Sequence, residues 1–220
     1  MPSTTLAADD NDDAKNSILD GFISLQLLPS SISSTKSPDI KNPDWLQKII
    51  DDEAAVKYRP MTITYGVSTR GSVSTNFDEF KSLVSLTLND ERGWSRMGIN
   101  FQEVASNGSF TLVLSKASQL TSFSDYCSVD WSCRVGSYVI INENRWLYAT
   151  DSWNNAGGSL RDYQHMVINH ETGHWLGHRD TNIGCSISDQ PAPVMQQQSI
   201  NLMGCRFNPW PLASELWTNR

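Results

Sequence analysis

The sequence predicts an α+β fold: a twisted mixed sheet, a long helix that carries the candidate active site, and a smaller, irregular C-terminal part with disulfides. Three observations predict this class. Four segments rich in β-branched and aromatic residues alternate with two segments of helical period after residue 58. All four histidines of the chain fall within the second helical segment or directly after it. Four cysteines lie between and after the predicted elements, where they can close loops.

The 220-residue chain carries 17 Lys and Arg against 24 Asp and Glu, and its net charge of −7 is concentrated at one end. Residues 1–57 hold ten of the acidic and five of the basic residues, so that 58–220 carry a net charge of only −2. Binding to a phosphate backbone requires clustered Lys and Arg, and the sequence offers no such cluster. We therefore expect no nucleic-acid partner.

The most apolar stretch near the N-terminus covers 18–28. It is interrupted by Asp20 and Gln26, and it is shorter than the ~18 apolar residues that a membrane-spanning helix needs. Acidic residues precede it, where an export signal would carry positive charge. We therefore expect no transmembrane segment, export signal or anchor in this chain.

Three regions are expected along the chain. Residues 1–40 are acidic and serine-rich, which indicates a flexible tail or linker. Residues 41–57 are expected to form a short helical lead-in, because Asn42 followed by Pro43 is typical of a helix start. Residues 58–220 are expected to form the folded domain. Whether the part before the domain is a latency propeptide or a tether stays open.

Local patterns place the elements of this domain in order. Strands are predicted at 61–67, 98–105, 109–114 and 138–142, and helices at 76–88 and 160–176. The first helix has Asp78 and Glu79 in its first turn, which favours a helix N-terminus. Asn107 and Gly108 are typical of a turn and separate the second strand from the third.

The second helix has clear ends. Gly157 and Gly158 break the chain before it, and Ser159 with Asp162 three residues later resembles a capping box. Gly177 is typical of the residue that ends a helix. The sequence therefore predicts that the chain turns back directly after residue 177.

The same helix contains an H-E-x-x-H motif formed by His170, Glu171 and His174. Residues four apart project from one helix face about 6 Å apart along the axis, so two imidazole nitrogens can meet one ion at ~2.1 Å. Glu171 lies on the flank of that face, where its carboxylate can take a proton from a metal-bound water. The motif predicts one catalytic Zn²⁺ with Glu171 as general base.

This stretch resembles the extended motif of the metzincin zinc endopeptidases, H-E-x-x-H-x-x-G-x-x-H. His170, Glu171, His174 and Gly177 match it, and Asp180 stands where the family has a third histidine. The snapalysin branch of small secreted bacterial proteases has aspartate at that place, and a carboxylate oxygen is an acceptable zinc ligand. The resemblance therefore implies that His170, His174 and Asp180 hold the zinc.

Two other residues compete for the place of third ligand. On a continuous helix, the Cα of His178 would lie about 12 Å along the axis from that of His170, too far for the rings to share an ion. We expect His178 at the turn after the helix, supporting the ligands, facing substrate or lying on the surface. Asp189 is the second choice, since one clan of zinc proteases has an aspartate ligand at a longer spacing. His165 is expected on the helix surface and Trp175 in the core.

Metzincins also have a methionine turn beneath the metal. The segment Pro191–Met195 fits this turn, because two prolines fix its course, and Met195 would support the site; Met203 is a weaker candidate. Some metzincins add a tyrosine ligand two residues after this methionine. Gln197 stands there, so no such ligand is implied.

A second resemblance covers most of the predicted domain. The segment PAPVMQQQ, the two cysteines that flank it and YVIINENRW over 138–146 resemble a bacterial family of metzincin-like domains of unknown function. The resemblance extends over about 58–217. That family is expected to have histidine at the position of Asp180, so this chain departs from both patterns at the same place.

The four cysteines permit three pairings. We favour Cys127 with Cys133 and Cys185 with Cys205, because each bond then closes a loop rich in polar and turn residues. Four reduced thiols in a cytosolic protein are the alternative. Paired cysteines imply an oxidising compartment, so we expect a secreted or extracytoplasmic protein.

Together these features predict a monomeric zinc-dependent endopeptidase, a hydrolase whose substrate is a polypeptide. By resemblance, the substrate would lie extended along an edge strand, at 109–114 or 138–142. The alternative is a catalytically silent, zinc-stabilised binding or scaffold module of metzincin fold. Glu171 argues against this alternative, because a structural zinc site needs no carboxylate beside a water molecule. Cleavage specificity stays open, since the walls of the pocket come from loops.

Overall fold

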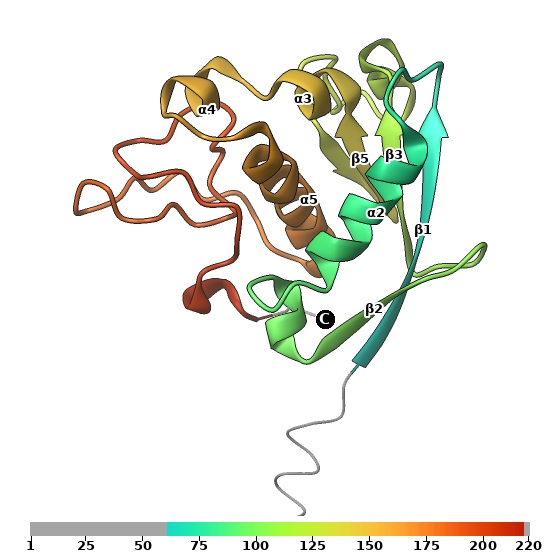
Figure 1. The fold of residues 1–220 in the computed structure, drawn as a ribbon, viewed down its shortest axis with the longest axis horizontal. Coiled ribbons are helices and arrows are strands. Elements are labelled where there is room, and N and C mark those ends of the chain that lie inside the picture. The colour runs from blue at the N-terminus through green and yellow to red at the C-terminus, as the bar shows by residue number, and fades with distance from the viewer. Residues whose placement is uncertain (1–60, 218–220) are drawn as a thin grey trace, which may run out of the picture. The chain divides into compact units, whose positions relative to one another are not determined.

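The computed structural model of the chain describes residues 61–217, and the fold there is mixed α and β (Figure 1). The predictions for 1–40 and 41–57, and for a domain start at 58, lie outside these residues. The helices and strands are β1 (Met61–Arg70), α2 (Phe77–Leu88), β2 (Ile99–Glu103), β3 (Phe110–Ser115), β4 (Cys133–Val135), β5 (Tyr138–Asn142), α3 (Glu143–Tyr148), α4 (Asp151–Asn155) and α5 (Leu160–Leu176). Short 3₁₀ helices occur at η1 (Trp94–Met97), η2 (Ala117–Ser122) and η3 (Ala213–Glu215).

The five strands form one sheet in the order β2-β1-β3-β5-β4. Four of the strands run parallel, and β4 pairs antiparallel with β5, so the predicted mixed sheet is confirmed. Strand β1 is three residues longer than predicted, because its first half pairs with β2 and its second half with β3. Strand β4 was not predicted, because three residues are too few to show the alternation of a strand.

The chain crosses over β1 between β2 and β3, at the predicted turn. The Val104 amide donates to the Tyr65 carbonyl on one side of β1, and the Ser109 amide donates to the Thr64 carbonyl on the other, each at 2.8 Å. A Cβ on Gly108 would lie 2.9 Å from the Tyr65 backbone, closer than real contacts allow. Only glycine therefore fits at this crossing.

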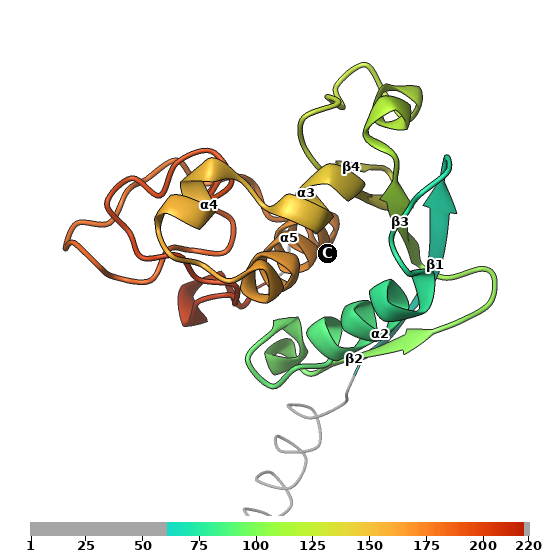
Figure 2. The ribbon, with the colours of Figure 1, turned by 45° about the horizontal axis from the view of Figure 1, so that its top comes forward.

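The face of the sheet that carries α2 and α5 forms the main core (Figures 1 and 2). Alternate residues of β3 and β5, such as Leu112 and Ile141, point to this side. The residues between them, Val113 and Ile140, point to the other side and join a small cluster with Leu120 of η2. The motif helix is therefore packed directly on the sheet.

Helix α5 has the predicted bounds. The Ser159 hydroxyl accepts a hydrogen bond from the Asp162 amide at 3.0 Å, as in a capping box. In a full capping box the Asp162 carboxylate would also accept from the Ser159 amide. Here it accepts from the Ser159 hydroxyl instead, at 2.8 Å. Gly177 ends the helix with φ of +105°, a conformation that favours glycine. The short helices α3 and α4 were not predicted, because one or two turns give too little periodicity.

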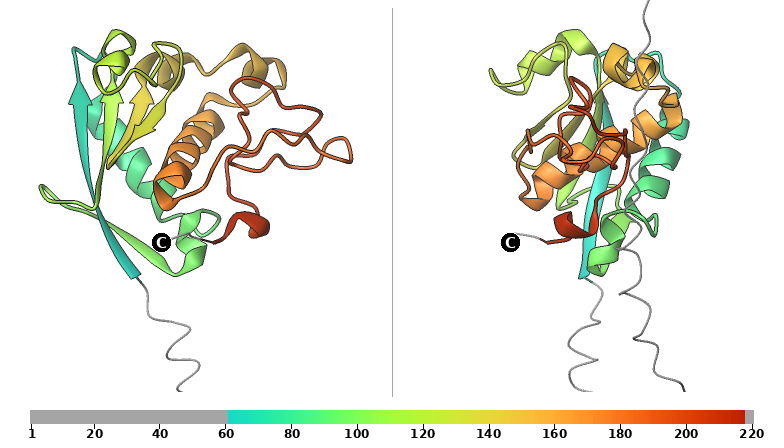
Figure 3. Two further views of the ribbon diagram at one scale, coloured as in Figure 1. Left: turned by 180° about the vertical axis from the view of Figure 1, so that it is seen from behind. Right: turned by 90° about the vertical axis from the view of Figure 1, so that its left-hand side faces the viewer.

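After α5 the chain is irregular up to Trp217 except for η3, and it lies beside α5 on the side away from the sheet (Figures 1 and 3). The predicted disulfides Cys127–Cys133 and Cys185–Cys205 are both present. The second bond closes a loop within this irregular part. No helix of the described residues is long and apolar enough to cross a membrane.

Candidate metal centre

Three predicted ligands meet at the end of α5. His170 and His174 project from one helix face, and the turn at Gly177 brings the chain back so that Asp180 lies opposite them. The Asp180 Oδ1 atom lies 3.2 Å from His170 Nε2 and 3.3 Å from His174 Nε2. One donor atom from each of the three residues lies within 4.8 Å of the others.

Backbone carbonyls fix both imidazole rings. His170 Nδ1 lies 2.9 Å from the Val194 carbonyl oxygen, and His174 Nδ1 lies 3.1 Å from the His178 carbonyl oxygen. A carbonyl only accepts, so each Nδ1 carries a proton and each neutral ring presents a lone pair at Nε2. Two imidazole lone pairs and a carboxylate oxygen thus converge, and this arrangement needs a cation or a proton at its centre.

The two distances from Asp180 are compatible with zinc. Two ligands bound at ~2.1 Å in tetrahedral geometry lie about 3.4 Å apart, close to the 3.2 and 3.3 Å that separate Asp180 Oδ1 from the two Nε2 atoms. The donor set of two nitrogens and one carboxylate oxygen leaves a fourth position open for water. Without a metal, a proton would take this place. Burial opposes the charged forms of both His170 and Asp180, but the contact with Asp180 raises the pKa of His170. The two histidines hold the pKa of Asp180 far below its ordinary value.

Glu171 lies beside these ligands and has a different environment. Its side chain is buried, and its Oε2 atom has no hydrogen-bond partner among the described residues. Burial raises the pKa of this carboxyl above its ordinary value, although the neighbouring histidines act in the opposite direction. A buried carboxylate oxygen without a donor is costly, and a bound water would satisfy it.

Met195 lies beneath the motif, where the methionine turn was expected. It is buried against Gly173, and a Cβ on Gly173 would collide with the Met195 sulfur and with Trp94. Glu215, which the sequence analysis did not select, accepts from the amides of Val194 and Met195 at 2.9 Å each. This buried carboxylate fixes the segment whose carbonyl orients His170.

Gln197 has a role that the sequence did not indicate. Its Nε2 atom donates to Asp180 Oδ2 at 3.0 Å, so it orients the carboxylate whose other oxygen faces the histidines. In the sequence, its position two residues after Met195 indicates only that the tyrosine ligand of some metzincins is missing. An amide that holds a ligand leaves no local pattern in the sequence.

A cavity of about 410 Å³ opens over these groups. Its floor comes from α5 and from the segment after Met195, and its opposite wall comes from β4 and the loop before it. The lining residues are Tyr126, Trp131, Ser132, Cys133, Arg134, Tyr163, Met166, Val167, His170, Glu171, His174, Asp180, Gln197, Gln198, Ser199 and Ile200. The three metal-binding candidates and Glu171 thus face one open cleft.

His178 lies at the turn after the helix, as expected, but its side chain does not face the cleft or the surface. It is buried, with its ring centroid 4.7 Å from that of Trp94 and 4.3 Å from that of Trp217, so it neither faces substrate nor lies on the surface. Its support for the site comes from the backbone, because its carbonyl holds the ring of His174.

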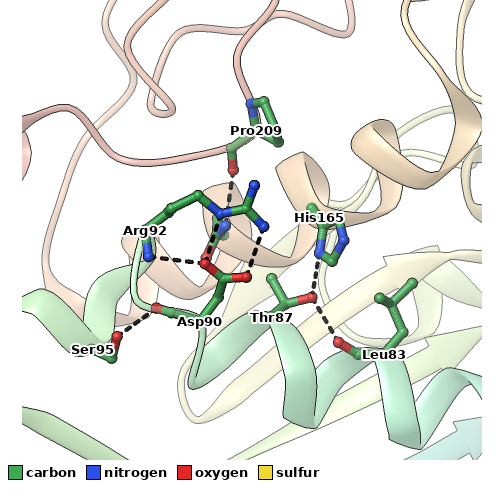
Figure 4. Close-up of polar contacts among 8 residues, drawn as sticks. Leu83, Thr87, Asp90, Arg92, Ser95, His165 and Pro209 are labelled. Atoms are coloured by element: carbon green, nitrogen blue, oxygen red, sulfur yellow. Dashed lines mark hydrogen bonds and ion pairs between the residues drawn. The ribbon is translucent and has the colours of Figure 1, made fainter.

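The prediction that His165 lies on the helix surface was wrong. The ring is half-buried and packs against Trp210, and its Nδ1 atom lies 2.8 Å from Thr87 Oγ1 (Figure 4). The Thr87 hydroxyl donates to the Leu83 carbonyl, so the histidine is the donor in this contact. Burial lowers the pKa of His165, which favours the neutral ring. Trp175 is buried, as predicted.

The alternatives for the third ligand and for the methionine turn lie elsewhere. Asp189, the alternative third ligand, is exposed and lies outside the metal-binding group found among the described residues. Met203, the alternative for the methionine turn, is also exposed. The two segments expected to form the substrate-binding edge, 109–114 and 138–142, are internal strands. Within the described sheet the edges are β2 and β4, and β4 is the one that lines the cleft.

The chain matches the family described as protein of unknown function (DUF3152) over residues 43–204, most of its length. The chain belongs to this family. None of the curated proteins compared with it matches. The description of the DUF3152 family assigns no activity, so the resemblance to metzincins stays a prediction from the motif.

Proposed function

We propose that this DUF3152 protein is a zinc-dependent endopeptidase of metzincin type, in which His170, His174 and Asp180 bind one catalytic zinc ion. The proposal is supported chiefly by one observation. Two imidazole lone pairs and a carboxylate oxygen converge at 3.2–3.3 Å, beside a buried glutamate oxygen that has no hydrogen-bond partner among the described residues. This pairing of a ligand set with an unpartnered carboxylate suits hydrolysis better than a purely structural metal site.

The chain's own residues divide the work of such a reaction. The zinc ion would supply a Lewis acid that makes a bound water more acidic and polarises the substrate carbonyl. Glu171 would take the proton of the attacking water and later give it to the leaving amine. Val194 and His178 hold the ligand rings by their carbonyls, and Gln197 holds Asp180. Met195 would support the site from below.

The cleft suits an extended chain. We propose that a polypeptide lies along the free edge of β4, which corrects the earlier expectation of β3 or β5, because both of these are paired on two sides. The two disulfides support an extracytoplasmic location.

The test measures bound zinc and the cleavage of casein and of a peptide library for four proteins. Wild type should bind one zinc ion and cleave. Glu171→Ala should retain zinc and lose at least about 100-fold in cleavage rate, the usual effect of removing a general base. Asp180→Ala should lose most of its zinc affinity. Asp189→Ala is the matched control, since it removes an exposed aspartate outside the site, and it should keep both properties.

Two results would contradict the proposal. Zinc binding without cleavage, in the full chain and in a chain shortened to 58–220, would favour a zinc-stabilised binding or scaffold module. Loss of zinc in Asp189→Ala, but not in Asp180→Ala, would show that the third ligand is Asp189 and not Asp180.

A further inference from the structure

The edge strand β4 places one arginine on the same face of the sheet as the candidate metal centre. Cys133 and Val135 pack into the small cluster on the opposite face, and side chains alternate along a strand. Arg134 between them therefore points to the side that carries α5. Its register partner on β5, Val139, belongs to the main core on that side.

Arg134 lines the cleft with both motif histidines and Glu171. It is exposed, and it forms no ion pair with a described residue. Among the described residues, its guanidinium makes a single long hydrogen bond, 3.4 Å, to the Gly136 carbonyl. A guanidinium offers five donors, so most of them remain available to a ligand in the cleft.

The acidic groups of the cleft have other roles. Among the described residues that line it, Glu171 and Asp180 are the only carboxylates, and both belong to the metal centre. A second cation, Arg145, lies over the ring of Trp131, which lines the cleft, at 5.1 Å and donates to two backbone carbonyls. The cleft thus has one cation, Arg134, that forms no ion pair with a described residue, although its charge also acts on the Glu171 carboxyl and lowers the pKa of that group.

We propose that Arg134 selects peptide substrates with an acidic side chain next to the bond that is cleaved. This inference rests on the proposed peptidase function. A guanidinium binds a carboxylate through two parallel hydrogen bonds, and such charge-assisted bonds are stronger than neutral ones. A cleft partly closed by protein walls screens the pair less than open water does.

A structural role for the same charge is the main alternative. Charged side chains on edge strands prevent pairing between sheets of neighbouring molecules. That role requires only a charge at the edge, and it does not require the side chain to face the cavity of the metal centre. The two roles predict different results for peptides that differ in one charge.

The first measurement uses fluorogenic octapeptides of one sequence that carry Glu, Gln or Lys at each position flanking the cleaved bond in turn. Wild type should cleave the best Glu peptide about 10-fold or more faster, in kcat/KM, than its Gln counterpart, as expected for a charge-assisted pair. Lys at that position should be the poorest. Equal rates for Glu and Gln at every position would overturn the inference.

The second measurement reverses the charge. Arg134→Glu should favour Lys over Glu at the selected position. Arg134→Lys should keep a reduced preference for Glu, since lysine retains the positive charge but cannot form the two parallel hydrogen bonds of a guanidinium. Arg161→Glu is the matched control, because Arg161 is exposed on α5 and lies outside the cleft. It should keep the wild-type preference. An equal loss in Arg134→Glu for all three peptides would place Arg134 at the reacting carbonyl and refute the selection of acidic side chains.

Binding separates this inference from the proposed function. The anisotropy of the same labelled peptides is measured with zinc-loaded Glu171→Gln, with and without Arg134→Glu. If wild type cleaves nothing but the Glu peptide binds about 10-fold tighter than the Gln peptide, and Arg134→Glu removes this difference, then the peptidase proposal fails and the role of Arg134 holds. Cleavage or binding without any dependence on peptide charge would refute the role of Arg134 alone.

Discussion

Two buried glutamates, Glu171 and Glu215, have opposite surroundings. Glu215 accepts three backbone N–H groups, from Val194, Met195 and Leu212, at 2.8–2.9 Å. Glu171 has one oxygen, Oε2, with no hydrogen-bond partner among the described residues. A fully bonded buried carboxylate stabilises the fold, whereas an unpartnered one costs stability. The difference separates a residue that holds the site from one that is available for chemistry.

Glu143 at the start of α3 resembles Glu215. Its Oε1 accepts from the amides and hydroxyls of Ser74 and Thr75, and its Oε2 pairs with Lys116 at 3.1 Å. Burial alone would raise the pKa of this carboxyl, but these donors hold it below its ordinary value. Burial by itself therefore does not distinguish the proposed general base from a structural carboxylate, but the number of hydrogen-bond donors around the carboxylate does distinguish Glu171 from Glu143 and Glu215.

The largest loss of stability is expected for a substitution of Glu215. In Glu215→Gln, the amide group must face at least one of the backbone N–H groups, and two donors then meet in a buried place. We expect a loss of about 3 kcal/mol in the free energy of unfolding, as for a buried charged hydrogen bond. Urea denaturation of the zinc-free protein measures it. A loss below about 0.5 kcal/mol, the scale of an ordinary surface change, would remove the contrast with Glu171.

A smaller loss is expected for Glu143→Gln. The amide oxygen can still accept from Ser74 and Thr75, and Lys116, which is partly exposed, can turn to water. We expect a loss of about 1.5–2 kcal/mol, at the low end of the range for hydrogen bonds to charged groups. If the same denaturation experiment gives a larger loss than Glu215→Gln, the explanation by donor geometry is wrong.

The stabilisation from Glu143 should depend on pH. Because the pKa of Glu143 is lower in the folded than in the unfolded protein, its contribution is present above pH ~4.5 and is lost as the pH falls through the lowered folded value. The difference in stability between wild type and Glu143→Gln should therefore shrink below pH ~4.5. Denaturation of both proteins between about pH 3 and about pH 7 measures this difference in stability. A constant difference would contradict the assignment.

The contact from Gln197 to Asp180 should affect the metal more than the fold. Gln197→Ala should weaken zinc binding by about 10-fold, the low end for residues that orient a ligand. Its stability without zinc should stay within about 0.5 kcal/mol of wild type. Competition with a chelator gives the affinity. Unchanged affinity would show that Asp180 needs no support from this side chain.

The smallest change in stability is expected at Glu171 itself. Glu171→Gln removes a buried charge with an unpartnered oxygen, so the zinc-free protein should be as stable as wild type or more stable. Thermal unfolding without zinc measures it. A clear loss of stability would show that Glu171 is a structural carboxylate like Glu215, and the contrast between the two would disappear.

The sequence predicted the parts of the site that lie within one helix. The spacing of His170 and His174, the cap at Ser159 and the end at Gly177 are local, because helix geometry relates residues three or four apart. Asp180 was proposed from the position of a motif, and both disulfides from the loops that they close. The sequence did not reveal Glu215 and Gln197, which act through contacts 20 and 17 residues away in the chain.

The corrections have the same origin. Strand β5 became internal because β4 pairs antiparallel with it, a pairing of three residues that no local pattern marks. Strand β3 is internal because it pairs with both β1 and β5. The expectations for His165 and His178 came from the local helix pattern, but tryptophans from distant segments pack against both rings and leave His165 half-buried and His178 buried.

The sequence by itself determined the motif helix and the residue types that can bind zinc, because both depend on spacing along one element. The tertiary structure decided which of the three candidates for the third ligand lies beside His170 and His174, which glutamate has an oxygen without a hydrogen-bond donor, and which edge strand borders the cleft. These properties depend on groups brought together from distant parts of the chain, and burial changes the energy of a charge only after those groups have met.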